Sequence, residues 1–304
     1  PQRALALWEQ AAELGGDFST LHRNIALGYS RVKKDQKQAI ASLERAHELE
    51  PGDAQILLEL DQLYEAEGRQ PASRLAMLER CQPVVDEHDG ILAREIVLFV
   101  RLGQFDRAIE LLTDHTFTVW EGSGDIHDVW VNALLARGRL RLEKGDHNGA
   151  LQDFRLALNW PANLAVGRPI NGGREPEATY YIGKTYAAMG QNAEAIKQYK
   201  LAVKHISRPT SELAYTQALA QLELGQREGA EKTFKALESN GRKMIDGDSV
   251  DYFAKFGEKR SENLRMADAH YLLGLGLLGQ GNMDEANAEF TKALELNINQ
   301  LGAA

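Results

Sequence analysis

The stretch "ADAHYLLGLGLLGQGNMDEANAEFTKALELN", residues 267–297, predicts two consecutive helices joined by a tight turn. Gly281 marks the end of the first helix, where glycine readily adopts the left-handed backbone of a helix end. Gly274 has no Cβ, so the second helix can cross close to the first. Ala286 keeps the second helix thin at the crossing, and Phe290 fills the space between the two helices. The stretch therefore predicts one closely packed helix pair.

The same pattern recurs along the chain. Residues 133–161 and 180–206 repeat it clearly, and weaker copies include "LERAHELEP", "LYEAEGRQPASRLAML", "RLGQFDRAIELL" and "LELGQREGAEKTFKAL". Seven residues occupy the equivalent turn position: Lys34, Gly68, Gly103, Gly145, Gly190, Gly225 and Gly281. Three of the intervals between them are 34 or 35 residues, and the others are 42, 45 and 56 residues. Self-similarity at a nearly fixed period is typical of a repeat array, and the longer intervals indicate three insertions.

The spacing of Leu273, Gly274, Gly281, Ala286 and Phe290 resembles that of the tetratricopeptide repeat. The resemblance extends over most of the chain. It implies an all-α fold, a right-handed superhelical solenoid of antiparallel helix pairs whose first helices line a concave groove. Proteins of this family bind peptides or partner proteins in that groove, so the resemblance implies a protein-binding role.

We expect a single solenoid over residues 1–304. It begins with a half unit at residues 1–19. Seven helix pairs follow, at about residues 20–53, 54–88, 89–122, 131–164, 176–209, 211–244 and 267–300. The insertions are expected at about residues 113–130, 161–175 and 240–266.

The composition excludes several classes of protein. The formal net charge is −9 and no basic block occurs, which argues against nucleic acid or an anionic membrane as a partner. No apolar run is long enough to span a bilayer. Cys81 is the single cysteine, so no internal disulfide can form and a reducing, cytoplasmic compartment is favoured. Because the chain opens at Pro1 in mid-pattern, we expect it to be part of a longer protein.

The insertions and the predicted first helices supply the candidate binding residues. Long loops on a rigid scaffold often carry binding residues, and three of the four tryptophans lie in or beside the first two insertions. Tyrosines in the predicted first helices either face the groove or pack between helices, and the sequence leaves both interpretations open. The candidates are Trp120, Trp130, Trp160, Arg168, Arg174, Tyr180, Lys184, Tyr215 and Tyr271.

The stretch "TVWEGSGDIHDVW", residues 118–130, allows four interpretations. A metal site would use suitable ligand types, namely His115, Asp125, His127 and Asp128. An acid/base pair of Glu121 with Asp125 or Asp128 would suit glycoside hydrolysis. The stretch is otherwise a tryptophan-rich docking surface, or a loop whose indole rings pack back onto neighbouring helices. We favour these last two, and expect no metal or other cofactor.

We interpret the chain as a non-catalytic scaffold for protein–protein or domain–domain contacts. A basic clamp for a peptide carboxylate is absent, because Arg23, Asn24 and Lys184 fall in different units. The Trp-Glu-Gly loop and "ALNWPANLAVGRP" are similar to the C-terminal repeat region of certain large bacterial proteins with an uncharacterised, carbohydrate-enzyme-like N-terminal part. That similarity implies an alternative function, a C-terminal accessory module of a carbohydrate-active enzyme. Its partners would be the N-terminal domain and carbohydrate.

Overall fold

The computed structural model describes residues 2–118, 126–169, 173–205, 211–247, 262–297, 300 and 302. The regular elements in these residues are all helices, which confirms the predicted all-α class. Contacts divide the chain into two compact units. Unit 1 comprises Pro1–Arg107 and Thr116–Ile126, and unit 2 comprises Ala108–His115 and His127–Ala304. No helix in the described part is long and apolar enough to cross a membrane.

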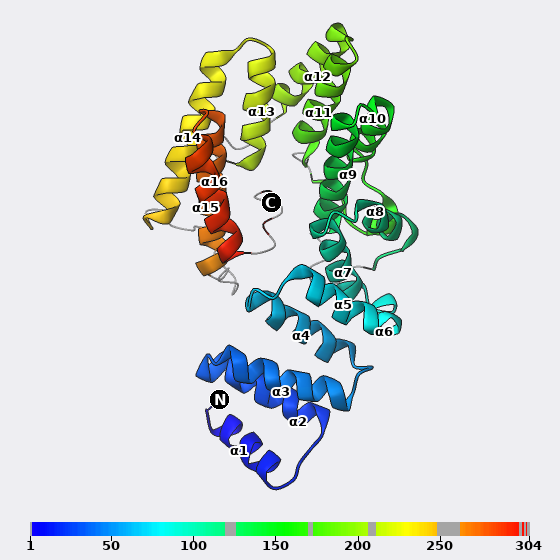
Figure 1. Ribbon diagram of the computed structural model, residues 1–304, viewed down its shortest axis with the longest axis vertical. Helices are drawn as coiled ribbons and strands as arrows, with labels where there is room; N and C mark the ends of the chain where they lie inside the picture. Colours follow the sequence, from blue (N-terminus) through cyan, green and yellow to red (C-terminus); the bar gives the residue numbers. More distant parts are fainter. Residues whose placement is uncertain are drawn as a thin grey trace. The chain divides into compact units, whose positions relative to one another are not determined.

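Unit 1 is built from short helices that pack on their neighbours in the chain (Figure 1). They are α1 (Gln2–Glu13), α2 (Ser19–Gly28), the π-helical turn η1 (Tyr29–Lys33), α3 (Gln36–Leu49), α4 (Ala54–Ala66), α5 (Pro71–Arg80), α6 (Gln82–Asp86) and α7 (Asp89–Arg101). Asp35 and Asp53 cap the starts of α3 and α4, because their carboxylates accept hydrogen bonds from backbone N–H groups of the first turn. Pro71 begins α5, a position where a missing N–H costs nothing.

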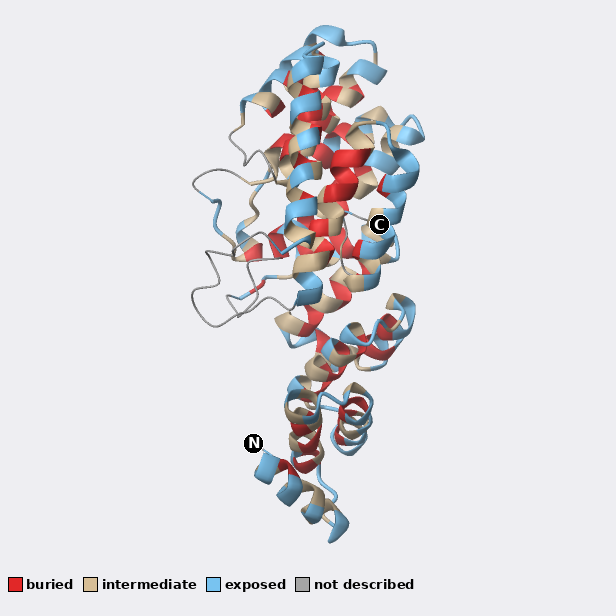
Figure 2. Cartoon of the chain, turned by 90° about the vertical axis from the view of Figure 1, so that its left-hand side faces the viewer, coloured by how far each residue is buried: buried red, intermediate tan, exposed pale blue. Residues whose placement is uncertain are grey.

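Unit 2 contains four consecutive helix pairs, preceded by most of α8 (Phe105–Asp114). The pairs are α9 (Ile126–Glu143) with α10 (His147–Leu156), α11 (Glu175–Ala188) with α12 (Asn192–Lys204), α13 (Glu212–Glu223) with α14 (Arg227–Ile245), and α15 (Glu262–Gly279) with α16 (Met283–Leu296). A 3-10 turn, η3 (Ala162–Leu164), follows α10. The first helices α11, α13 and α15 also contact one another in this order. Figure 2 shows the buried residues, in red, along the helix sides that meet other helices.

The turns inside the helix pairs follow the sequence pattern closely. Each of the seven predicted turn residues has a positive φ, from 56° at Lys34 to 86° at Gly281. Glycine adopts this left-handed conformation without strain, which explains its presence at six of the seven positions. The turn positions that define the repeat are therefore confirmed.

In three helix pairs of unit 2, an aromatic ring of the second helix packs directly against a glycine of the first helix. A Cβ added at Gly274 would lie 2.4 Å from Cε1 of Phe290. A Cβ added at Gly138 would lie 2.4 Å from Cε1 of Phe154, and a Cβ added at Gly183 would lie 2.6 Å from Cε1 of Tyr199. The ring thus occupies the volume of the absent side chain, as the sequence predicted for the last pair.

We expect Gly274→Leu to destabilise the last pair by about 1–3 kcal/mol, because the new side chain would overlap the ring of Phe290. Urea denaturation of the variant and the parent chain measures this loss. Gly167→Leu is the control, since nothing lies within 4 Å of a Cβ at Gly167. Equal stability of the two variants would contradict the ring-on-glycine packing.

The helices of unit 2 extend into two of the predicted insertions. α9 already begins at Ile126, and α14 continues to Ile245. The buried residues Val129 and Ala133 lie one helical turn apart, so the buried face of α9 extends back into the stretch predicted as loop. The prediction of a loop is therefore wrong for residues 126–130. Residues 119–125, 170–172 and 248–261 lie outside the described part, and the unit boundaries remain predictions.

Candidate functional site

The three candidate tyrosines occupy one position of the repeat and share one contact. Each ring packs against the aromatic ring that follows it by 19 residues in the second helix. The centroid distances are 6.0 Å for Tyr180–Tyr199, 5.7 Å for Tyr215–Phe234 and 6.0 Å for Tyr271–Phe290. Packing between helices thus accounts for the recurrence of tyrosine. Tyr180 is buried, and Tyr215 and Tyr271 are partly buried.

An acidic residue stands one helical turn before each of these tyrosines. The pairs occur in "EATY" (177–180), "ELAY" (212–215) and "DAHY" (268–271), on α11, α13 and α15. Residues three apart lie on the same side of a helix, so each acid and its tyrosine share a face. The sequence analysis missed Glu177, Glu212 and Asp268. The recurring acid–x–x–Tyr motif is the signal that would have identified them.

The three acidic residues form a row along the first helices, and Arg174 binds the first of them, Glu177. Its guanidinium makes a bidentate ion pair with Glu177, with Nε–Oε2 and Nη2–Oε1 distances of 2.5 and 2.9 Å. It also donates to the side-chain oxygen of Asn132 on α9, at 2.5 Å. Only 18% of the Arg174 side chain is exposed, so this charge is fixed by its partners rather than presented as an open donor.

The second acidic residue of the row, Glu212, has a raised pKa. Its side chain reaches solvent, but protein on several sides desolvates it and raises the pKa of the carboxyl. Arg174 acts in the opposite direction. Three like charges raise the pKa further, those of Glu177, Asp128 and Asp268. Negative charges from three other helices, α9, α11 and α15, therefore act on Glu212.

The two partly buried tyrosines lie near these charges. Desolvation raises the pKa of Tyr215 to about 12. Desolvation also raises the pKa of Tyr271, and the charges of Glu212 and Glu177 raise it further. We call this surface the first-helix face. Its residues are Asp128, Asn132, Arg174, Glu177, Glu212, Tyr215, Asp268 and Tyr271. Aromatic rings beside carboxylates form a surface that suits polar and cationic groups.

The tryptophans contribute less to a surface than the sequence suggested. Trp130 is 4% exposed on α9, which removes it from the candidate binding residues. Trp160 stacks on His127, with ring centroids 3.4 Å apart and planes inclined by 5°. The indole ring of Trp160 also packs against Gly173, where an added Cβ would lie 2.8 Å from Cζ2 of Trp160. These two rings pack back onto the fold, and Trp120 lies outside the described residues.

The remaining candidate cations are held in ion pairs. Arg168 pairs with Glu175 at 2.9 Å, and Lys184 of α11 pairs with Glu223 of α13 at 3.2 Å. Both cations are exposed enough to exchange partners, and such surface pairs contribute little stability. The structure therefore brings Arg174, Tyr215 and Tyr271 into one neighbourhood and leaves Arg168 and Lys184 outside it.

The metal and acid/base interpretations of residues 118–130 gain no support. His127 is buried, and its Nε2 lies 3.1 Å from the carbonyl oxygen of Asn159. Burial also lowers the pKa of the His127 imidazole. No group of three or more His, Cys, Asp or Glu residues in the described part could hold a metal ion. Glu121 and Asp125, which the acid/base hypothesis requires, lie outside the described residues.

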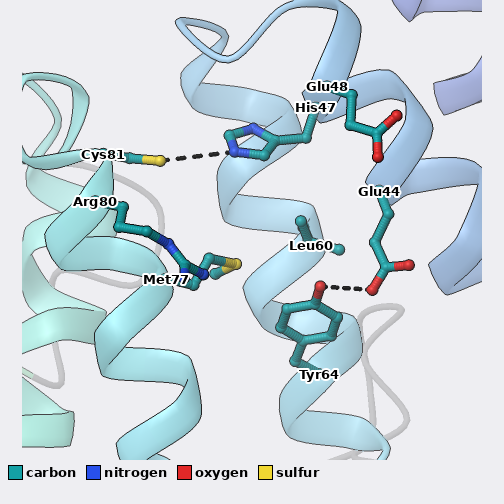
Figure 3. A pocket seen from close by; sticks show the side chains of 8 residues that line it. All are labelled: Glu44, His47, Glu48, Leu60, Tyr64, Met77, Arg80 and Cys81. Atoms are coloured by element: carbon teal, nitrogen blue, oxygen red, sulfur yellow. Dashed lines mark hydrogen bonds between the residues drawn. The ribbon is translucent and has the colours of Figure 1, made fainter.

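Unit 1 has a pocket of about 320 Å³ that contains the single cysteine (Figure 3). Cys81 Sγ lies 3.6 Å from Nε2 of His47, and Tyr64 donates to Glu44 at 2.7 Å. Burial raises the pKa of the thiol and lowers the pKa of the imidazole. Both shifts disfavour the thiolate–imidazolium pair of a catalytic Cys–His site.

Comparisons with known proteins found family models and solved structures that are similar to parts of this chain. Residues 177–205 and 267–300 match family models described as tetratricopeptide repeat. A solved tetratricopeptide repeat protein from Parabacteroides merdae is 16% identical, with a TM-score of 0.47 over 91% of this chain and 93% of that one. The Naa15/Naa10 complex bound to HypK is 16% identical, with a TM-score of 0.45 over 97% of this chain and 50% of that one.

A third solved structure, the type IV pilus biogenesis factor PilW, is 16% identical to this chain. Its TM-score is 0.41, over 73% of this chain and 93% of that one. The two segments that match the family models coincide with the pairs α11/α12 and α15/α16. The chain therefore carries tetratricopeptide repeats in these segments.

Proposed function

We propose that the chain is a non-catalytic scaffold that binds another protein, or another domain of its own protein, through the first-helix face of unit 2. Tetratricopeptide repeats support a role in protein–protein interaction. We choose this surface because the acid–x–x–Tyr motif recurs on three first helices that contact one another in order. Packing between helices explains the tyrosines, but it does not require an acid at the same surface position each time.

A sugar site in the loops of this chain would need exposed tryptophan rings that could stack on a sugar. Trp130 is buried and Trp160 is stacked on His127, so neither offers a free face of that kind. We therefore do not propose a sugar site here.

Charge reversal on the first-helix face tests this proposal. Glu212→Lys should abolish co-purification of the proteins that bind the wild-type chain in extracts of its source cells, because it reverses the central charge of the face. Glu228→Lys is the matched control, since Glu228 is also exposed and also lies in the first turn of its helix, α14. Loss of partners in both variants, or in neither, would count against the first-helix face. Thermal denaturation verifies that both variants are folded.

A further inference from the structure

The helix α1 carries the residue pattern of a second helix. Ala4, Trp8 and Ala11 repeat the spacing of an alanine, a large residue and another alanine that also occurs in α3, α12 and α16. Trp8 stands 35 positions before Leu43, the large residue of this pattern in α3, and this distance is one repeat period. The burial of these positions in the other second helices therefore shows which contacts α1 is built to make.

In the complete helix pairs, the pattern lies on the side of the second helix that faces its own first helix. The residue directly before the aromatic ring also faces that helix. Asp153 pairs with Arg137 of α9 at 2.7 Å. Glu289 lies 2.5 Å from His270 of α15. The first alanine of the pattern is 0–2% exposed in five second helices, at Ala39, Ala150, Ala195, Ala230 and Ala286.

In α1 the same side of the helix is uncovered. Ala4, Trp8 and Ala11 are only partly buried. Leu7, the residue before the aromatic ring, is 56% exposed. Leu14 follows Leu7 by two helical turns on the same side and is 82% exposed. We call these five residues the open side of α1.

The opposite side of α1 is firmly packed against the rest of unit 1. Leu5 is 2% exposed and fits against Gly28 of α2, where an added Cβ would lie 2.6 Å from Cδ1 of Leu5. Glu9 accepts a hydrogen bond from Tyr29 at 2.7 Å and pairs with Lys33 at 2.7 Å. α1 is therefore held in place as a second helix is held by the next pair, and only its contact with a first helix is unfilled.

The helix pairs of unit 2 indicate what would fill this contact. Their aromatic rings pack against a small residue of the first helix, which is glycine in three pairs and Ala218 opposite Phe234 in the fourth. Trp8 therefore calls for glycine or alanine on an opposing helix. Leu7 is apolar where Asp153 and Glu289 form ion pairs, so the residues opposite it should be apolar as well.

We propose that the open side of α1 binds an amphipathic helix of a partner protein, which takes the place of a first helix. A glycine or alanine of that helix packs against the Trp8 ring, and its apolar residues cover Leu7 and Leu14. α1 and the bound helix then form an intermolecular helix pair that continues the packing between the helices of unit 1. This surface belongs to unit 1, so the inference goes beyond the proposed function, which concerns unit 2.

Fluorescence anisotropy with a labelled helical peptide tests this proposal. The peptide has the sequence of residues 175–190, "EPEATYYIGKTYAAMG", which supplies the first helix α11 and its glycine, Gly183. It should bind to the whole chain. A second peptide with Gly183→Leu should bind roughly tenfold more weakly, because the new side chain would overlap the Trp8 ring.

A charge on the open side of α1 identifies where the peptide binds. Leu7→Glu should abolish binding of the first peptide, because it would bury a carboxylate in an apolar contact. Leu201→Glu is the matched control, since Leu201 is 54% exposed on α12, and it should leave the affinity unchanged. Thermal denaturation verifies that both variants are folded.

The outcomes decide between the possible occupants of this surface. Absence of binding, equal binding of the two peptides, or full binding by Leu7→Glu overturns the proposal. Sedimentation velocity of the chain alone tests for a second copy. A dimer that Leu7→Glu dissociates would assign the open side to self-association and would also overturn the partner helix. The proposed function is decided separately, by whether Glu212→Lys loses the partners that Glu228→Lys retains.

Discussion

Asp61→Ala should destabilise unit 1 by about 3–5 kcal/mol, because the buried guanidinium of Arg74 loses its nearest counter-charge and keeps only the more distant Glu65, at 3.6 Å. Asp61 on α4 and Arg74 on α5 are almost completely buried and form two hydrogen bonds of 2.8 Å. Arg94 on α7 also donates to the same carboxylate. One carboxylate thus joins three helices, and its removal leaves a charge where water cannot reach.

Urea denaturation followed by circular dichroism measures the free energy of unfolding of this variant. Glu48→Ala is the control, since its side chain is 65% exposed and pairs only with Arg45 at the surface. The control should match the wild type. A loss for Asp61→Ala no larger than that of the control would show that the buried network contributes nothing to unit 1.

The same network makes unit 1 sensitive to acid. Burial alone would raise the pKa of Asp61, but the hydrogen bond from Arg74 and the charge of Arg94 outweigh it and hold the pKa below its ordinary value. A carboxylate with a lowered pKa stabilises the fold above the unfolded value of about 3.9, and this contribution is lost as pH falls through the folded pKa. The stability difference between the wild type and Asp61→Asn should therefore shrink below about pH 4. A difference that is constant with pH would contradict this assignment.

Phe234→Ala should destabilise unit 2 by about 3–5 kcal/mol. Phe234 on α14 is 1% exposed and packs with Ala218 and Ala230 of its own pair. Its ring also fills the space beside Gly279 of α15, where a Cβ would lie only 2.1 Å from Cδ1 of Phe234. The ring therefore belongs both to its own helix pair and to the contact with the next pair, and its removal leaves a cavity in each.

The matched control for Phe234→Ala is Leu222→Ala, because Leu222 is 40% exposed on α13. Chemical denaturation of the two variants should show a large loss for the first and a small loss for the second. Similar losses would mean that the contact between the last two pairs does not depend on the Phe234 ring.

Features determined by local backbone chemistry could be predicted from the sequence. The positions of the turn residues were predicted correctly. A chain that reverses direction between two helices within two or three residues needs a residue with a positive φ, and glycine adopts that conformation easily. The pairing of Gly274 with Phe290 was correct because a missing Cβ and a large ring complement each other in one repeat. The helical start of α9 was not predicted, since Trp130 was interpreted as a loop residue although its burial belongs to a helix face.

The candidate site was predicted only in part. Tyr215 and Tyr271 were found by their recurrence, but acids at the start of a helix are common because they favour the positive end of the helix dipole. Glu212 therefore carried no distinct signal as a single residue. The recurring acid–x–x–Tyr motif marks its position, but the charges that act on it from three other helices are visible only in the structure. Arg174 was predicted as a candidate binding residue, yet the fold encloses it between Glu177 and Asn132.

Hydrogen–deuterium exchange of the whole chain, with and without a protein that co-purifies with it, tests the binding surface most directly. If the first-helix face is the partner site, the bound protein should slow exchange in α11, α13 and α15, around Glu177, Glu212 and Asp268. Exchange in α12, α14 and α16 should stay the same. Protection confined to those second helices, or to unit 1, would contradict the assignment of partner binding to the first-helix face.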